Sequence, residues 1–162
     1  MRHGADATAS DADGNTVYHY ACVPPRPALL AQLLRHDHDG KARSMGAVNE
    51  AGLSAAAVAV EGRTRADQLC LQQMLEAGSS YMRHAKAGGG TLIHHAVAHG
   101  TTRQLTILLE ACDKHNQKRT FLDIKDESGH TPLCASVRTS QHECVTKATC
   151  PSCPSHTFSH LL

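Results

Sequence analysis

Gly129-His130-Thr131-Pro132-Leu133-Cys134 is the clearest of four copies of one motif in this chain. The position of Thr131 recurs as Thr16, Ser54 and Thr91, and these positions are separated by 38, 37 and 40 residues. Each copy is followed at helical distance by an apolar pair or its remnant, namely Leu33-Leu34, Met74-Leu75, Leu108-Leu109 and Val145. Recurrence at such a period is typical of proteins built from stacked repeats.

The residue types in the motif predict a turn followed by a helix. A Thr or Ser side chain can cap a helix by accepting a backbone N–H, and Pro132 suits the first helical position, where no N–H is needed. A glycine lies two residues before each Thr or Ser, where a turn requires positive φ. These glycines are Gly14, Gly52, Gly89 and Gly129.

The motif resembles the ankyrin repeat, whose period is about 33 residues. The resemblance implies an all-α fold, an ankyrin-repeat solenoid of about four helix-turn-helix repeats with hairpin loops. His19 and His94 occupy the family's usual histidine position, which implies that they bridge backbone groups of adjacent hairpins and are not catalytic. The expected domains are a flexible segment at 1–10, repeats at 11–48, 49–85, 86–125 and 126–148, the last incomplete, and a tail at 149–162.

Apolar periodicity gives bounds for the helices of the first three repeats. Ala55-Ala56-Ala57 replaces the favoured Pro-Leu-His of the second repeat, but its helix should form because Ala is the best helix former. Gly78 is the expected C-cap of the helix that follows. We expect first helices at 16–22 and 91–99 and second helices at 28–35, 67–77 and 102–111.

The composition excludes several classes of function. Hydrophobic residues make up 41% of the chain and aromatic residues only 3%, which suits a core of stacked small helices rich in Ala, Leu and Val. A net charge of +1 supplies no overall field for nucleic acid or an anionic membrane. No apolar run approaches the roughly 20 residues of a membrane span, and the N-terminus lacks the apolar core of a signal peptide.

No enzymatic activity and no cofactor are expected. No Gly-rich phosphate loop follows a strand, and no nucleophile comes with a base and its orienting group. His95 and His99 have the i, i+4 spacing of metal ligands, but no Glu lies between them as a zincin motif requires. We therefore place both on the exposed part of the first helix, in a contact surface, and expect no metal site.

The cysteines indicate a reducing compartment. There are seven, an odd number, and five of them lie scattered through the repeats, so most should be small buried side chains in a cytosolic or nuclear protein. The tail carries zinc-ligand types at Cys150, Cys153, His156 and His160. A closed zinc site normally has a loop of about a dozen residues between its ligand pairs, so adventitious binding is favoured over a zinc-dependent interaction module, which stays as a rival.

The long intervals between copies of the motif resemble those of the inhibitor-of-κB (IκB) class of ankyrin proteins, including its insect relatives of the Cactus type. The stretched first repeat and the stretched connection before residue 126 are similar to that class, as is the run 126–133. The resemblance implies binding to the Rel-homology region of an NF-κB-type transcription factor. That factor would be held in the cytoplasm with its basic nuclear-import segment covered, and its immune signalling would be suppressed.

Residues 1–10 carry no Asp-Ser-Gly-x-x-Ser phosphodegron, and 149–162 contains no acidic residue. The resemblance then implies a minimal, signal-resistant inhibitor, like the short IκB-like ankyrin proteins (vankyrins) of some insect-associated viruses; a truncated splice form is an equal alternative. The alternative function is a generic ankyrin adaptor with an unrelated protein partner. We expect a cytoplasmic protein, with the nucleus as a second location.

Partner contacts are expected on the concave face made by hairpin tips and first helices, the surface by which solenoids bind others. Asp11 and Asp13 make the first hairpin acidic, which suits a basic partner segment. By register with the family's variable positions, the expected contacts are Asp11, Ala12, Asp13, Asn15, Glu50, Ala51, Glu61, Ala87, Ala98, His99, Glu127, His130, Arg138 and Thr139.

Overall fold

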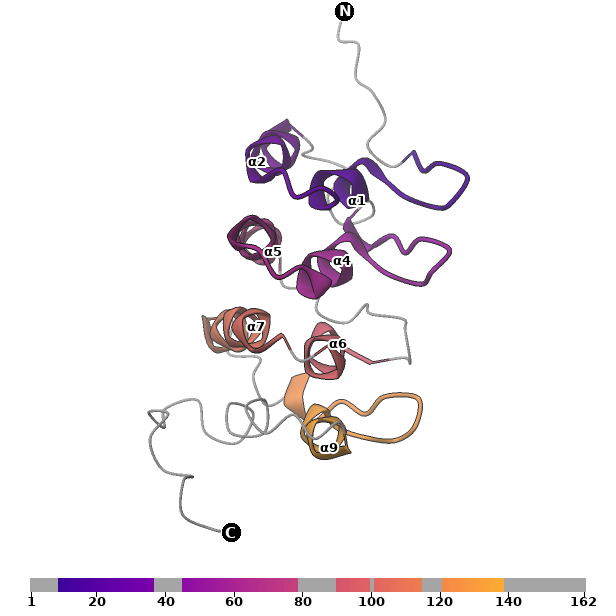
Figure 1. Cartoon of the computed structure of the whole chain (residues 1–162), viewed down its shortest axis with the longest axis vertical. Helices are drawn as coiled ribbons and strands as arrows, with labels where there is room; N and C mark the ends of the chain where they lie inside the picture. The colour runs from indigo at the N-terminus through magenta and orange to yellow at the C-terminus, as the bar shows by residue number, and fades with distance from the viewer. Residues whose placement is uncertain (1–8, 37–44, 79–89, 100, 115–120, 139–162) are drawn as a thin grey trace, which may run out of the picture.

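The chain is built from pairs of short helices stacked along one axis (Figure 1). The computed structural model describes residues 9–36, 45–78, 90–99, 101–114 and 121–138. Its helices are α1 (Val17–Cys22), α2 (Pro27–His36), α4 (Ala55–Glu61), α5 (Arg65–Ala77), α6 (Leu92–Ala98), α7 (Thr102–Lys114) and α9 (Pro132–Arg138). The described part has isolated bridges but no strand, so the all-α prediction is confirmed. None of these helices is long and apolar enough to cross a membrane.

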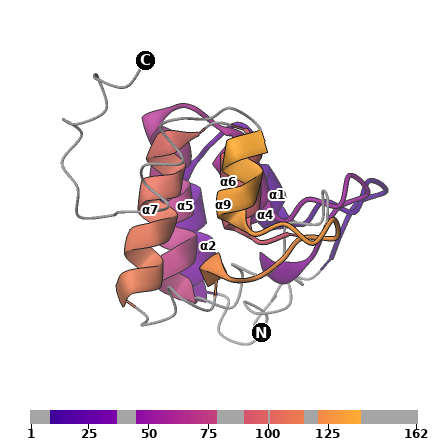
Figure 2. The ribbon, with the colours of Figure 1, turned by 90° about the horizontal axis from the view of Figure 1, so that it is seen from below.

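The helices form two layers. The inner helices, as we call α1, α4, α6 and α9, lie in one layer on the side of the described hairpin loops, and the outer helices α2, α5 and α7 lie behind them (Figures 1 and 2). Each inner helix packs against the next, α1 on α4, α4 on α6 and α6 on α9, while α5 packs between α2 and α7. Each described helix therefore contacts mainly its own pair and the adjacent pairs, as expected when repeats stack.

The helix starts follow the predicted caps, with one correction. Ser54 caps α4, because its hydroxyl accepts the backbone N–H of Ala57 at 3.3 Å. Helix α5 begins two residues earlier than expected, since Thr64 and Asp67 cap it reciprocally: the Asp67 N–H donates to Thr64 Oγ1 at 3.2 Å, and the Thr64 N–H donates to Asp67 Oδ2 at 2.8 Å. Gly78 is the C-cap, but its φ of 169° is ordinary extended backbone, so glycine's conformational freedom is not required there.

The core runs between the two layers and is made of small and aliphatic side chains. Leu71, Met74, Leu105 and Leu108 are fully buried on the outer helices, so the apolar periodicity predicted their inward face correctly. On the inner side, Ala55 to Ala57 of α4 are fully buried too. Alanine lacks the bulk to hold helices apart, which lets α4 lie close to both α1 and α6.

Candidate partner-binding surface

Three hairpin loops of the same geometry project from the inner helices (Figure 2). In the first, the Asp11 N–H donates to the Asn15 carbonyl at 3.1 Å and the Gly14 N–H donates to the Asp11 carbonyl at 3.1 Å. The equivalent pair of bonds measures 3.0 and 2.8 Å in the hairpin at 49–53, and 2.8 and 2.9 Å in the hairpin at 126–130. The repeated motif therefore produces one turn structure in each described copy.

Two residue types in the motif explain this turn. The glycine has φ of 75°, 73° and 78° at Gly14, Gly52 and Gly129, which confirms the predicted positive φ, while Gly89 lies outside the described residues. The side chain of the first hairpin residue accepts the backbone N–H four residues on. These bonds join Asp11 to Asn15 at 2.8 Å, Asn49 to Leu53 at 3.0 Å and Asp126 to His130 at 2.8 Å.

His19 and His94 bridge backbone groups, as predicted. The Thr16 N–H donates to His19 Nδ1 at 3.1 Å, and His19 Nε2 lies 3.0 Å from the Leu53 carbonyl in the next hairpin. His94 repeats this geometry, because it accepts from the Thr91 N–H at 3.1 Å and its Nε2 lies 3.0 Å from the His130 carbonyl. In each case Nε2 donates, since a carbonyl can only accept. Both histidines are structural links between repeats.

Further bonds fix the first two hairpins side by side. The Glu50 N–H donates to the Asp13 carbonyl at 2.9 Å, and Asn49 Nδ2 donates to Asn15 Oδ1 at 3.1 Å. The tips therefore keep a set spacing before any partner arrives.

Most of the expected contact residues lie at the surface. The half-buried ones are Asn15 and His130. Arg138 ends α9, and Ala87 and Thr139 lie outside the described residues. The exposed ones are Asp11, Ala12, Asp13, Glu50, Ala51, Glu61, Ala98, His99 and Glu127.

Asp11 and Asn15, two of the expected contacts, are also bonded within their own hairpin. The Asp11 carboxylate accepts the Tyr20 hydroxyl, the Asn15 N–H at 2.8 Å and the Asp13 N–H at 3.0 Å. These bonds, that of Tyr20 first, hold the pKa of Asp11 below its ordinary value. The carboxylate is therefore held in place by its hairpin while it stays charged and exposed, and Asn15 is tied into the same turn. Contact of these two residues with a partner stays a prediction.

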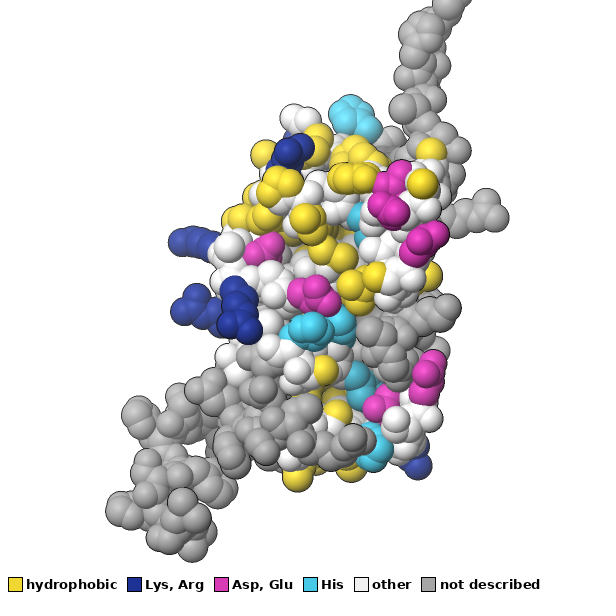
Figure 3. Space-filling model, turned by 45° about the vertical axis from the view of Figure 1, so that its right-hand side comes forward, with side chains coloured by type: hydrophobic (Ala, Val, Ile, Leu, Met, Phe, Trp, Pro, Cys, Tyr) yellow, Lys and Arg dark blue, Asp and Glu magenta, His cyan; other side chains and the backbone are white. Residues whose placement is uncertain are grey.

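Acidic side chains gather on the hairpin side of the stack (Figure 3). The described hairpins carry the carboxylates of Asp11, Asp13, Glu50, Asp126 and Glu127, and the cation of Lys125 directly precedes the third hairpin. Asp11, Asp13, Glu50 and Glu127 are exposed, and bonds within their turns hold Asp11 and Asp126 in position. A row of carboxylates on a fixed backbone suits a basic ligand.

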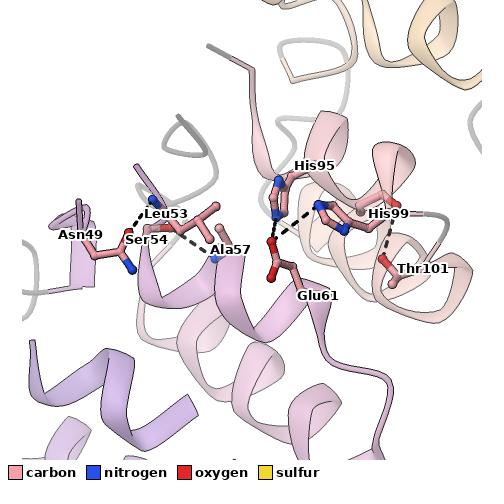
Figure 4. A network of polar contacts seen from close by, with 9 residues as sticks. Asn49, Leu53, Ser54, Ala57, Glu61, His95, His99 and Thr101 are labelled. Carbon is pink, nitrogen blue, oxygen red and sulfur yellow. Dashed lines mark hydrogen bonds and ion pairs between the residues drawn. The ribbon is translucent and has the colours of Figure 1, made fainter. Parts of the chain in front are cut away.

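The far ends of the inner helices hold a second polar group, Glu61 with His95 and His99 (Figure 4). Glu61 Oε1 lies 3.1 Å from His95 Nε2 and 3.5 Å from His99 Nε2. The expectation that His95 is exposed is wrong: it is 5% exposed, because α6 packs on α4 and the ring faces Glu61. Burial lowers the pKa of His95, a charge on His99 lowers it further, and Glu61 opposes both.

Sequence reasoning placed Glu61 and His99 on the surface but did not bring them together. The register of the repeats could have predicted that these residues lie close together. Glu61 follows Ser54 by seven residues, as Ala98 follows Thr91, so it ends the inner helix of one repeat beside the end of the next.

Three of the four cysteines within the described residues are buried, in line with the prediction for most of the thiols. Cys22, Cys70 and Cys112 are buried, whereas Cys134 is exposed on α9. A hydrogen bond with Cys70, together with burial, raises the pKa of Cys22. Hydrogen bonds with Thr131 lower the pKa of Cys134.

The zinc-ligand types of the tail lie outside the described residues. Within those residues, the hairpin row and the Glu61 group are the two polar clusters on the inner side. No known protein-family model matches the chain.

Proposed function

We propose that this chain is an ankyrin-type protein-binding module that acts as an IκB-like inhibitor of Rel/NF-κB-type transcription factors. The ankyrin assignment is supported by the recurring unit of hairpin, inner helix and outer helix. It is also supported by the histidine bridge from each helix start to the following hairpin, seen at His19 and His94. This bridge is the role that the resemblance gave those residues.

The observation that carries the binding proposal is the row of exposed carboxylates on hydrogen-bonded hairpins. Asp13 and Glu50 sit on tips joined directly by the bond from the Glu50 N–H to the Asp13 carbonyl. Little conformational freedom is lost when a partner binds loops that are already fixed, which favours affinity. The basic nuclear-import segment of a Rel protein is complementary in charge to this row.

Covering that segment would keep the transcription factor in the cytoplasm, where this inhibitor would act. The same surface also suits a different basic protein, so the partner class is what the experiment must decide. The generic adaptor is the outcome if no Rel protein binds.

The test measures binding of the full chain to a panel of Rel-homology regions that retain their basic segments, in a buffer with chelator. We expect at least one to bind. The double variant Asp13→Asn/Glu50→Gln should weaken that complex about 2- to 30-fold, since exposed ion pairs contribute roughly 0.2–1 kcal/mol each. The loss should shrink as salt is raised, because salt screens exposed charges.

The control removes two carboxylates elsewhere, in Glu76→Gln/Glu110→Gln on the exposed surface of the outer helices α5 and α7. It should bind like the parent. Equal weakening by both double variants would locate the effect in overall charge rather than on the hairpins. No binding to any Rel protein, with the chain folded by circular dichroism, would leave the adaptor function instead.

A further inference from the structure

We propose that Glu61, His95 and His99 form a binding site for a zinc-type transition-metal ion. This proposal stands apart from the proposed partner. Glu61 ends α4, while His95 and His99 lie one turn apart at the end of α6, so the ligands come from two stacked helix pairs (Figure 4). One ligand atom from each residue lies within 4.8 Å of the other two.

The distances are close to those of a tetrahedral metal site. Zinc binds imidazole nitrogen and carboxylate oxygen at about 2.0–2.2 Å, so two ligand atoms on a tetrahedron lie roughly 3.3–3.5 Å apart. The two measured edges from Glu61 Oε1 are 3.1 Å to His95 Nε2 and 3.5 Å to His99 Nε2. The site is therefore nearly assembled, and closing it requires mainly a movement of the exposed His99 ring.

The donor set selects the class of ion. Two imidazoles and one carboxylate suit Zn²⁺ and its neighbours Co²⁺, Ni²⁺ and Cu²⁺, whereas Ca²⁺ and Mg²⁺ prefer oxygen ligands throughout. Burial favours the neutral form of His95, which is the form that binds a metal. Three protein ligands leave a fourth tetrahedral position open for water.

The site is open to solvent on one side and has a buried ligand on the other. The side chains of His99 and Glu61 are 44% and 38% exposed, so an ion can reach them from solvent, while that of His95 is 3% exposed. An ion held by all three would tie α4 to α6. Because the three ligands are close together only in the folded stack, binding would stabilise that stack.

The experiment uses the full chain carrying Cys150→Ser/Cys153→Ser, which removes the thiol ligands of the tail. Co²⁺ titration followed by visible absorption, and Zn²⁺ titration by calorimetry, should give one ion per chain. Saturating Zn²⁺ should raise the thermal unfolding midpoint by about 5–10 °C, as expected for an ion at roughly 100 times its Kd.

His99→Gln and Glu61→Gln carry the test, because both side chains are partly exposed and their loss should leave the fold intact. Each should weaken Zn²⁺ binding at least about tenfold and remove most of the thermal shift. The matched control is His130→Gln, whose ring is also near a carboxylate, with Nδ1 3.6 Å from Asp126 Oδ1, but on a hairpin. It should leave Zn²⁺ affinity unchanged.

Unchanged affinity in His99→Gln would overturn the site, and so would an equal loss in His130→Gln. Absence of any Zn²⁺ binding by the parent with intact helices would do the same. None of these outcomes depends on whether a Rel protein binds.

Discussion

Replacing His94 by alanine tests whether the histidine bridges hold the stack together. The ring is 7% exposed. Its Nδ1 accepts from the Thr91 N–H at 3.1 Å and lies 3.0 Å from Thr91 Oγ1, and its Nε2 donates to the His130 carbonyl at 3.0 Å. A buried hydrogen bond is worth about 1 kcal/mol, and a partner left unsatisfied costs about 1–3 kcal/mol. We therefore expect the free energy of unfolding to fall by about 2–4 kcal/mol.

The assay is urea unfolding followed by far-ultraviolet circular dichroism, with chelator present. His99→Ala is the control, because its side chain is 44% exposed and such changes usually stay within about 0.5 kcal/mol. Hydrogen exchange adds a local readout: the amides of α9 should lose more protection than those of α1, since repeats depend mainly on their neighbours. A loss below about 1 kcal/mol, or no larger than in His99→Ala, would refute the bridge as a source of stability.

Two further predictions concern charge and backbone strain. Burial is the main cause that lowers the pKa of both His94 and His95 from 6.5. In the window just below pH 6.5 the unfolded chain therefore binds more protons than the folded chain. The free energy of unfolding should therefore fall as pH drops through this window, and the fall should be shallower in His94→Ala. A free energy of unfolding that does not change from pH 7 to 5 would contradict the lowered pKa of these histidines. Gly129→Ala should cost about 1–2 kcal/mol in urea unfolding, because φ is +78° although the added Cβ meets no atom within 4 Å. Gly46→Ala also has open space but no positive φ, so it should be nearly neutral, and equal costs for the two variants would rule out the strain explanation.

The local structure was predictable because the motif encodes it directly. Each positive-φ glycine and each capping Thr or Ser acts within a few residues, so the hairpins and the starts of the inner helices followed from residue types alone. Helix α5 began earlier than expected because Thr64 is its N-cap and Asp67, at the third helical position, bonds back to Thr64 instead of starting the helix. A capping role of this kind is recognised only from the backbone groups with which the side chain forms hydrogen bonds.

The surface was predictable in position but not in role. Register placed Asp11 at a hairpin and Glu61 among the expected surface contacts, and both are exposed. What register cannot supply is the bond that each side chain makes. The Asp11 carboxylate is taken up by its own turn and Tyr20, and His95 is turned toward a residue 34 positions earlier. Such contacts depend on the distance between neighbouring repeats, which local sequence patterns do not determine.

The second repeat lacks the bridging histidine of the motif and is linked to the third repeat by other contacts. The position of His19 and His94 is occupied there by Ala57, so the bridge from helix start to next hairpin cannot form. The junction between the second and third repeats is instead linked at the opposite end of the inner helix. There His95 pairs with Glu61 at 3.1 Å, and the buried Gln104 donates to the carbonyl of Gly62.

The proposed metal ligands gather at this same junction. A repeat that keeps its histidine is joined to the next through the hairpin, as His19 and His94 do. The junction without that histidine places a carboxylate and a buried imidazole together, with His99 beside them. Zinc would therefore reinforce the junction at which Ala57 stands in place of the bridging histidine. Its effect on hydrogen exchange should accordingly be largest in α4 and α6, rather than spread evenly through the stack.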